Sequence, residues 1–195
     1  AYEHENGVGP YDGPVWYVNG AESLPYGNGS VSAPYSMIGS AIGAAESGDT
    51  VHVAAATYVE NINFNGKNIA VIGEDKETTI IDGDSSGTVV TFNNGEDATA
   101  VLSGFTIQNG VASEGGGIYL YHSEPTLSNL LIKENSATNG GGIKFSANST
   151  GLTPTLDNVL ISSNTAANYG GGIAGWAYAD FYISNSTIEN NSAGS

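Results

Sequence analysis

The chain contains no cysteine and no arginine, and its only permanently cationic side chains are four lysines. Without cysteine it can form neither a disulfide nor a thiolate site. Twenty aspartates and glutamates bring the formal net charge to -16. Such a surface repels phosphates and anionic lipid headgroups, so we expect neither nucleic acid nor an anionic membrane surface as a partner.

A long apolar run is also missing, which argues against direct insertion into a membrane. The first residues, AYEHENG, are polar and show no targeting segment, as in a processed secreted chain. A self-repelling acidic surface suits a salty or extracellular medium, so we expect a secreted or cell-surface protein. At 195 residues the chain corresponds to one domain or to part of one.

Helical periodicity is confined to one segment of the sequence. In SMIGSAIGAAESGD the apolar residues Ile38, Ala41, Ile42 and Ala45 fall on one helical face. We therefore expect a helix over 36–48, preceded by a strand and loop over 1–35. From residue 49 onwards, short runs such as TVHVA, NIAVIG and AVLSGFTI end at Gly, Asn or Asp, which predicts strands. The fold class is all-β with one helix near the beginning.

The second half of the chain repeats itself. The blocks LSGFTIQN, LSNLLIKEN, LDNVLISSN and ISNSTIENN align on Ile107, Ile132, Ile161 and Ile188, whose spacings by subtraction are 25, 29 and 27 residues. Three of the blocks lead into Gly-Gly-Gly-Ile. A period in the twenties with two or three short strands per unit indicates a solenoid, so we predict a parallel β-helix over 49–195.

The repeated residues have structural roles in such a fold. Isoleucines at equivalent positions of successive coils would stack and fill the interior. Asparagines after each strand would pass amide hydrogen bonds from coil to coil, and glycine triplets would allow positive φ and close backbone approach at the next corner. The predicted ladder comprises Asn109, Asn135, Asn164 and Asn190 (or its neighbour Asn191), and the glycine turns comprise Gly115, Gly116, Gly117, Gly140, Gly141, Gly142, Gly170, Gly171 and Gly172.

Two stretches carry a resemblance to known proteins. The segment AIGAAESGDTVHVAAATYVENINFNGKNIAVIGED, Ala41 to Asp75, resembles the opening coil of right-handed parallel β-helix proteins of the pectin-lyase-like superfamily. The Asn … Gly-Gly-Gly-Ile units are similar to the repeats of chlamydial polymorphic outer-membrane proteins and related bacterial surface proteins. The resemblance implies right-handed coils and a capping helix. It does not specify function, because the superfamily includes lyases, hydrolases, esterases, adhesins and phage spikes.

The resemblance to polysaccharide lyases is incomplete where their chemistry would lie. Those enzymes use an arginine or lysine base beside calcium held by acidic residues, and this chain has no arginine. Lys133 and Lys144 flank a repeat turn and could be neighbours, but they suit a solvated face equally well. The Asp-Asp pair that polygalacturonases need does not occur. The sequence therefore favours a protein that is not an enzyme, with a polysaccharide lyase or hydrolase as the alternative.

One acidic turn suggests calcium, the only cofactor for which we find a candidate site. In IDGDSSG, Asp82 and Asp84 lie two residues apart before a turn, as ligands of calcium loops do. An aspartate-rich turn without metal is the more frequent case for this pattern.

Aromatic residues after the glycine triplets suggest a binding surface. If Ile118 and Ile173 point into the solenoid, then Tyr119, Tyr121, Trp176 and Tyr178 point outward, where rings could stack on sugars. Ordinary packing under a loop or against another copy of the chain would produce the same pattern.

The C-terminal segment STIENNSAGS stops where another Gly-Gly-Gly-Ile is expected, which would leave an open apolar interior and free strand edges. We expect this end to meet further domains of a longer chain or a second copy stacked head to tail, as in a filament. The leading hypothesis is therefore a secreted or cell-surface structural or adhesive β-helix, with polysaccharide as a further partner. The alternative is a carbohydrate-binding module or a polysaccharide lyase- or hydrolase-like protein.

Overall fold

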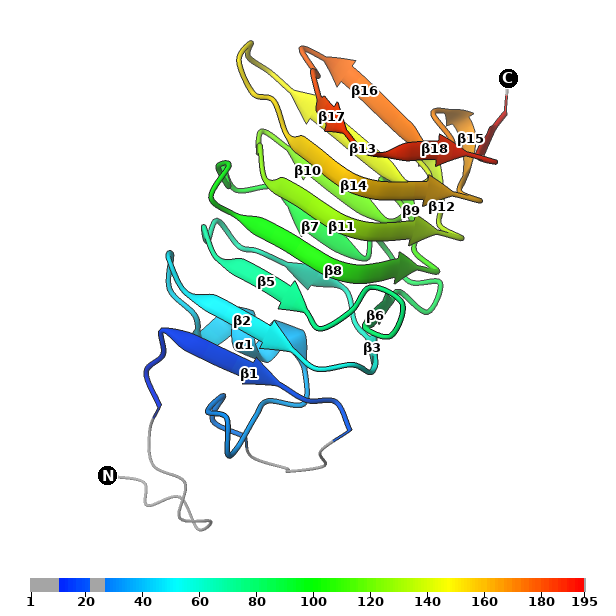
Figure 1. The fold of residues 1–195 in the computed structure, drawn as a ribbon. Coiled ribbons are helices and arrows are strands. Elements are labelled where there is room, and N and C mark those ends of the chain that lie inside the picture. The colour runs from blue at the N-terminus through cyan, green and yellow to red at the C-terminus, as the bar shows by residue number, and fades with distance from the viewer. Residues whose placement is uncertain (1–10, 22–26, 195) are drawn as a thin grey trace.

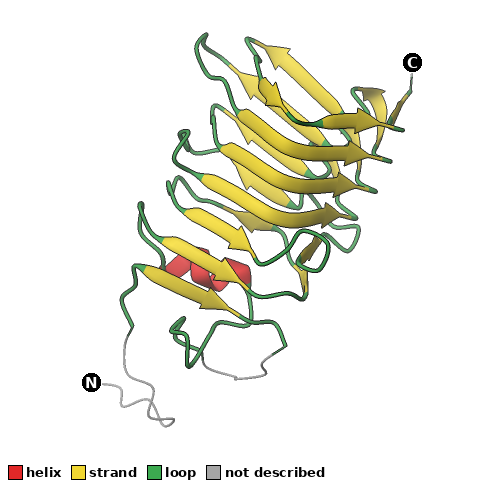
Figure 2. Ribbon diagram, viewed as in Figure 1, coloured by secondary structure: helices red, strands yellow, loops and turns green. Residues whose placement is uncertain are grey.

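The computed structural model describes residues 11–21 and 27–194. The chain forms a parallel β-helix of about five turns with one short helix, as the repeats predict (Figures 1 and 2). Successive coils stack as rungs from the N-terminal to the C-terminal end. Every pair of neighbouring strands is parallel, because each coil returns the chain to the same side of the solenoid before the next strand begins.

Three parallel sheets form the walls of the solenoid, and we number them I to III. Sheet I contains β1 (Val15–Val18), β2 (Thr50–Val53), β3 (Thr57–Val59), β5 (Ala70–Gly73), β6 (Ile80–Asp82), β8 (Val101–Gln108), β11 (Thr126–Lys133), β14 (Thr155–Ser162), β17 (Tyr182–Ser184) and β18 (Thr187–Glu189). Sheet II contains β4 (Ile62–Asn63), β7 (Val90–Phe92), β10 (Ile118–Tyr121), β13 (Ile143–Ala147) and β16 (Ile173–Ala177). Sheet III contains β9 (Val111–Glu114), β12 (Ser136–Asn139), β15 (Thr165–Tyr169) and β19 (Ser192–Ala193).

The interior is filled by stacks of like residues in register. Ile107, Ile132, Ile161 and Ile188 pair directly from coil to coil, which confirms the predicted alignment. The first three are fully buried. On another wall, sheet II contributes a stack of larger side chains, Phe92, Leu120 and Phe145, which Phe64 extends from just after β4.

Left-handed residues turn the chain at the corner that follows sheet I. The residue two positions after each stacked isoleucine has φ between 54° and 59°, and these residues are Asn109, Glu134, Ser163 and Asn190. A second such row lies inside the long strands, at Gly104, Asn129 and Asn158. At Gly104 a side chain is also excluded by contact, because a Cβ there would lie 2.3 Å from the carbonyl oxygen of Gly73.

The asparagine ladder runs through Asn135 and Asn164, as the sequence predicts, and through Asn191, the alternative to Asn190. The side-chain oxygen of Asn164 accepts hydrogen bonds from the backbone N–H and the side-chain amide of Asn135, both at 3.0 Å, and Asn191 does the same for Asn164. Gly110 occupies the ladder position in the coil before, where its N–H donates to Asn135. Asn109 and Asn190 are instead left-handed corner residues. The prediction of Asn109 was therefore wrong, and of the two alternatives in the last coil it is Asn191 that joins the ladder.

The glycine triplets form the corner that precedes sheet II. Gly115, Gly140 and Gly170 have φ of 60° to 69°. The other two glycines of each triplet face the next triplet, and a Cβ on Gly116 would lie 2.6 Å from the Gly141 carbonyl oxygen. Backbone N–H groups of one triplet donate to carbonyls of the next, so the corners of neighbouring coils are held together directly.

The helix α1 (Ile38–Ala44) is shorter at both ends than the predicted 36–48. It buries Ile38, Ala41 and Ile42 against the same core as the strands. Side chains of the solenoid cap both of its ends. The Glu60 carboxylate accepts the N–H groups of Ile38 and Gly39 at 2.8 and 2.9 Å, and the Lys67 ammonium donates to the carbonyls of residues 42, 43 and 45 at 2.7 to 2.8 Å.

The two ends of the solenoid differ. At the N-terminal end the backbone of Tyr17 and Asn19 is bonded to the loop 27–35, through Gly29 and Tyr35. At the C-terminal end no described strand pairs with the outer edges of β16–β19, and Ile188 is 48% exposed. The one helix in the described part of the chain is too short to cross a membrane.

Candidate functional site

The aromatic side chains that the sequence predicts to point outward lie on or next to the outer face of sheet II. Inward residues Ile118 and Leu120 alternate with outward Tyr119 and Tyr121, as strand geometry requires. Tyr121 is in register with Ser146 and then with Trp176, two coils further on. We call Tyr119, Tyr121, Lys144 and Trp176 the aromatic surface.

The rings of the aromatic surface are available to a ligand. Tyr119 and Tyr121 lie with ring centroids 6.1 Å apart and an interplanar angle of 23°. Tyr121 is 43% exposed and Trp176 is 63% exposed, whereas Tyr119 is partly covered. Tyr178, the fourth predicted residue, lies just beyond the end of β16 and is also exposed. The sheet fixes the backbone positions that carry the Tyr121 and Trp176 rings.

A buried ammonium lies between the tyrosines and the tryptophan. Lys144 is in register with Tyr119, and its Nζ lies 5.2 Å from the centroid of the Trp176 ring. The same Nζ lies 3.6 Å from a carboxylate oxygen of Glu114, whose other oxygen accepts a hydrogen bond from the Asn139 amide at 2.7 Å. The ammonium is thus neutralised by a carboxylate and packed against an aromatic face.

This environment changes the acidity of one tyrosine. Partial burial raises the pKa of Tyr119, and the nearby Glu114 and Tyr121 raise it further because each disfavours a phenolate. The Tyr119 hydroxyl therefore stays protonated at neutral pH and can donate a hydrogen bond to an uncharged acceptor.

His122 borders the aromatic surface in an unusual backbone conformation, with φ of 52°. Its ring meets the Tyr121 ring edge-on with centroids 3.9 Å apart. Its Nδ1 accepts the Asn148 N–H at 3.0 Å, which assigns the proton of the neutral ring to Nε2. That Nε2 is buried without a hydrogen-bond partner. The histidine therefore holds the turn after β10 and packs against Tyr121.

The predicted calcium residues are engaged in hydrogen bonds within the protein. One oxygen of Asp82 accepts the Asp84 N–H, and the other accepts the side-chain amides of Gln108 and Asn109, all at 2.8 to 2.9 Å. Burial alone would raise the pKa of Asp82, but these hydrogen bonds outweigh it and lower the pKa. In the described ranges no three His, Asp or Glu side chains gather as a metal site would need. Calcium binding stays a prediction of the sequence.

The two lysines considered as a lyase base lie on different walls of the solenoid. Lys133 ends β11 in sheet I, where its Nζ lies 3.6 Å from the carboxylate of Glu134. Lys144 belongs to β13 in sheet II. The turn between them contains a whole strand of sheet III, so proximity in sequence does not bring them together.

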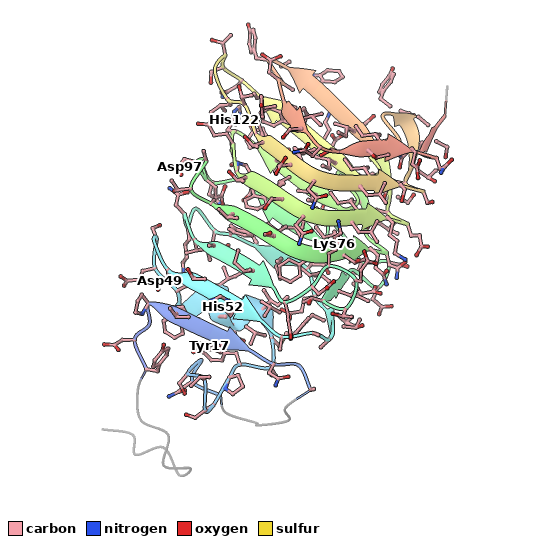
Figure 3. All side chains as sticks on the ribbon, in the orientation of Figure 1. Tyr17, Asp49, His52, Lys76, Asp97 and His122 are labelled. Carbon is pink, nitrogen blue, oxygen red and sulfur yellow. The ribbon has the colours of Figure 1, made fainter. Side chains whose placement is uncertain are left out.

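A cleft on the outer face of sheet I was not predicted. Its volume is about 460 Å³, and it lies between β1, β2 and β5 and the loop 27–35. Tyr17 and His52 stack across β1 and β2 with centroids 5.8 Å apart, and Figure 3 shows both on this face. Ile72 and Glu74 complete the sheet side, and Val31 and Pro34 form the loop side. Alternation with the buried Val51 and Val53 puts His52 on the outer face, but the cleft could not be predicted from this because its other wall comes from a segment about twenty residues away.

Comparisons with family models, with curated proteins and with solved structures gave no match to this chain. The resemblances noted in the sequence therefore have no support from a matched family, and function has to be inferred from the geometry of the chain itself.

Proposed function

We propose that this chain is a secreted or cell-surface β-helix that acts as an adhesive module and binds uncharged saccharides on the aromatic surface. The observation that carries the proposal is the register of Tyr121 and Trp176, two exposed rings on one outward row of sheet II. Backbone positions on one row of a parallel sheet recur at the coil spacing of about 4.8 Å, so the Cα atoms of these two residues lie about 10 Å apart along the solenoid.

Stacking of sugar rings on aromatic faces suits this arrangement. The C–H groups of a saccharide ring are apolar. Stacking them on an exposed aromatic ring is favourable because both apolar surfaces are removed from water. The two ring positions would contact a saccharide at more than one unit. The protonated Tyr119 hydroxyl and the Ser146 hydroxyl between the rings offer hydrogen bonds to sugar hydroxyls.

The charges of the surface favour an uncharged ligand. The only ammonium, that of Lys144, already faces the carboxylate of Glu114 and the ring of Trp176. The chain as a whole carries a formal charge of -16, which repels polyanions. We therefore expect neutral polysaccharides to bind and polyuronates to bind less well.

Native gel electrophoresis in the presence of neutral and acidic polysaccharides tests the proposal. We expect a neutral polysaccharide to retard the wild-type chain, and Trp176→Ala and Tyr121→Ala each to weaken binding by about tenfold. Tyr169→Ala is the control, because Tyr169 is about as exposed as Trp176 but belongs to β15 of sheet III. The proposal fails if no neutral polysaccharide retards the wild type, or if Tyr169→Ala weakens binding as much as Trp176→Ala.

A head-to-tail filament is not part of this proposal. The outer backbone groups of β1 are bonded to the loop 27–35, and the Tyr11 hydroxyl donates to the Val15 carbonyl. Strand pairing with the exposed C-terminal edge of another copy would have to break these hydrogen bonds first.

A further inference from the structure

We infer that the cleft on sheet I binds a small organic cation that carries an aromatic ring. This cleft lies on a different sheet from the aromatic surface, so the inference does not depend on the proposed saccharide function. Its volume of about 460 Å³ falls in the range of small-molecule sites.

The sheet side of the cleft is a flat platform. Tyr17, His52 and Ile72 occupy one outward row of β1, β2 and β5 in direct register. The Tyr17 and His52 rings are nearly parallel, with an interplanar angle of 27°. A planar ligand ring can therefore lie against them, and a cation above the tyrosine face is attracted by its negative potential.

The loop side of the cleft is fixed in place. Val31 and Pro34 belong to a turn in which Ala33 accepts the N–H of Gly29 and donates to the Ser30 carbonyl. The loop is anchored to the core because Trp16 stacks on Tyr35 with centroids 6.2 Å apart. Val31 is 73% exposed and lines the cleft, so it presents an apolar surface there. The walls exist before a ligand binds, which lowers the entropy lost on binding.

Among the described residues that line the cleft, one carries a formal charge at neutral pH, and it is the negative Glu74. One oxygen of the Glu74 carboxylate accepts the Ala55 N–H at 3.1 Å, which orients the group. Neither lysine nor arginine lines the cleft. An anionic ligand would lack a counter-charge here, whereas an ammonium would pair with Glu74 while its ring covers Tyr17 and His52. These features together select an aromatic amine.

The test compares two probes of similar size and opposite charge, phenethylamine and phenylacetate, by NMR titration of the full chain. We expect phenethylamine to shift the signals of Tyr17 and His52 and to bind at least about tenfold more tightly than phenylacetate. Equal affinity of the two probes, binding of neither, or shifts confined to the aromatic surface would each overturn the inference.

Two variants measure how much the Glu74 charge and the Tyr17 ring each contribute to phenethylamine affinity. Glu74→Gln keeps an acceptor for the Ala55 N–H, so the fold is retained, and we expect affinity for phenethylamine to fall about tenfold. Tyr17→Leu removes the ring but keeps an apolar residue on the row, and should also weaken binding. Trp176→Ala, on sheet II, should leave phenethylamine affinity unchanged. Unchanged affinity in Glu74→Gln would exclude the cationic ligand class.

Discussion

The two ends of the solenoid are built from different kinds of structure. The N-terminal end is covered by elements outside the repeat: α1 fills the interior, and the loop 27–35 bonds the edge of β1. The C-terminal end consists of repeat strands alone, and Ile183 and Ile188 are nearly half exposed there. The stacked isoleucines are fully buried where a coil lies on each side of them, and Ile188 in the last coil is half exposed. The same residue type therefore contributes less to stability at the open end than in the interior.

The caps of α1 show what a sealed end requires. A helix of seven residues leaves most of its backbone groups without partners inside the helix. Glu60 and Lys67, from the coil above, satisfy both termini with opposite charges of the sign that the helix dipole favours. No such charged caps are present among the described residues of the last coil.

The largest expected difference between the ends concerns isoleucine. Ile42 is fully buried in α1, and Ile42→Ala should lower the free energy of unfolding by about 3 kcal/mol through lost burial and a cavity. Ile188→Ala, at the open end, should lower it by less than about 1 kcal/mol. Urea unfolding monitored by circular dichroism measures both. Equal losses would mean that the C-terminal end is covered in solution.

The ladder provides the next comparison. Asn164→Ala would leave the Asn135 N–H and the Ile132 carbonyl without partners in the interior, and should destabilise by about 2 to 3 kcal/mol. Asn191→Ala, in the last coil, should destabilise by about 1 kcal/mol, because its groups are partly exposed. The same unfolding measurement applies. A larger loss in Asn191→Ala than in Asn164→Ala would contradict the proposed dependence on two neighbouring coils.

The third largest effect is expected at Lys67, which caps the C-terminus of α1 at the N-terminal end of the solenoid. Lys67→Met removes three hydrogen bonds to the last carbonyls of α1, and should destabilise by about 1.5 to 2 kcal/mol. Lys76→Met is the matched control, since it removes the same charge, and the Lys76 ammonium has no hydrogen bond or ion pair among the described residues. We expect its effect to be near zero. Equal effects of the two substitutions would attribute the loss to net charge rather than to the cap.

The smallest expected effects concern the pH dependence of stability, which should differ between Glu60 at the N-terminal end and Asp157 near the C-terminal end. Burial raises the pKa of Glu60 above its ordinary value of 4.5 despite hydrogen bonds from Gly39 and Ile38, so its contribution to stability is present below 4.5 and is lost as the pH rises through the folded-state pKa. Hydrogen bonds from Ser184 and Asn185 lower the pKa of Asp157 below 3.8. Its contribution is present above 3.8 and is lost as the pH falls through the folded-state pKa.

Glu60→Gln and Asp157→Asn should therefore change the pH dependence of stability in opposite directions. Relative to wild type, Glu60→Gln should remove a decline in stability as the pH rises from 4.5 towards neutrality. Asp157→Asn should remove a decline at pH values below 3.8. Urea midpoints measured from about pH 3 to about pH 7 compare them. Parallel curves for the two variants would mean that neither carboxyl has a shifted pKa.

The architecture could be predicted because it depends on a repeated pattern. The spacing of Ile107, Ile132 and Ile161 indicates coils of similar length, and stacking follows from that. The ladder was predicted correctly at Asn135 and Asn164 but wrongly at Asn109, because asparagine serves two purposes in this fold. It is the residue other than glycine that most readily adopts positive φ, so Asn109 and Asn190 turn the corner while Asn135 and Asn164 point inward. Composition alone does not distinguish these two positions.

The parts that could not be predicted depend on contacts between distant segments. Lys67 lies in a turn, and its partners in α1 are more than twenty residues away. The cleft needs both the row from Tyr17 to Ile72 and the separate loop bearing Val31. On the aromatic surface the outward tyrosines could be predicted from alternation, but the burial of Lys144 against Trp176 and Glu114 could not, since it depends on side-chain packing across coils.

The side-chain amides of the asparagine ladder are all oriented the same way. Each side-chain amide donates to the oxygen of the asparagine in the next coil, so the dipoles of Asn135, Asn164 and Asn191 point the same way and add along the solenoid axis. The positive end of this row emerges at the last coil, where the N–H of Asn191 faces the position that the oxygen of a next asparagine would occupy by the same register. A coil packed on that end would have to present an oxygen to Asn191 in order to extend the row.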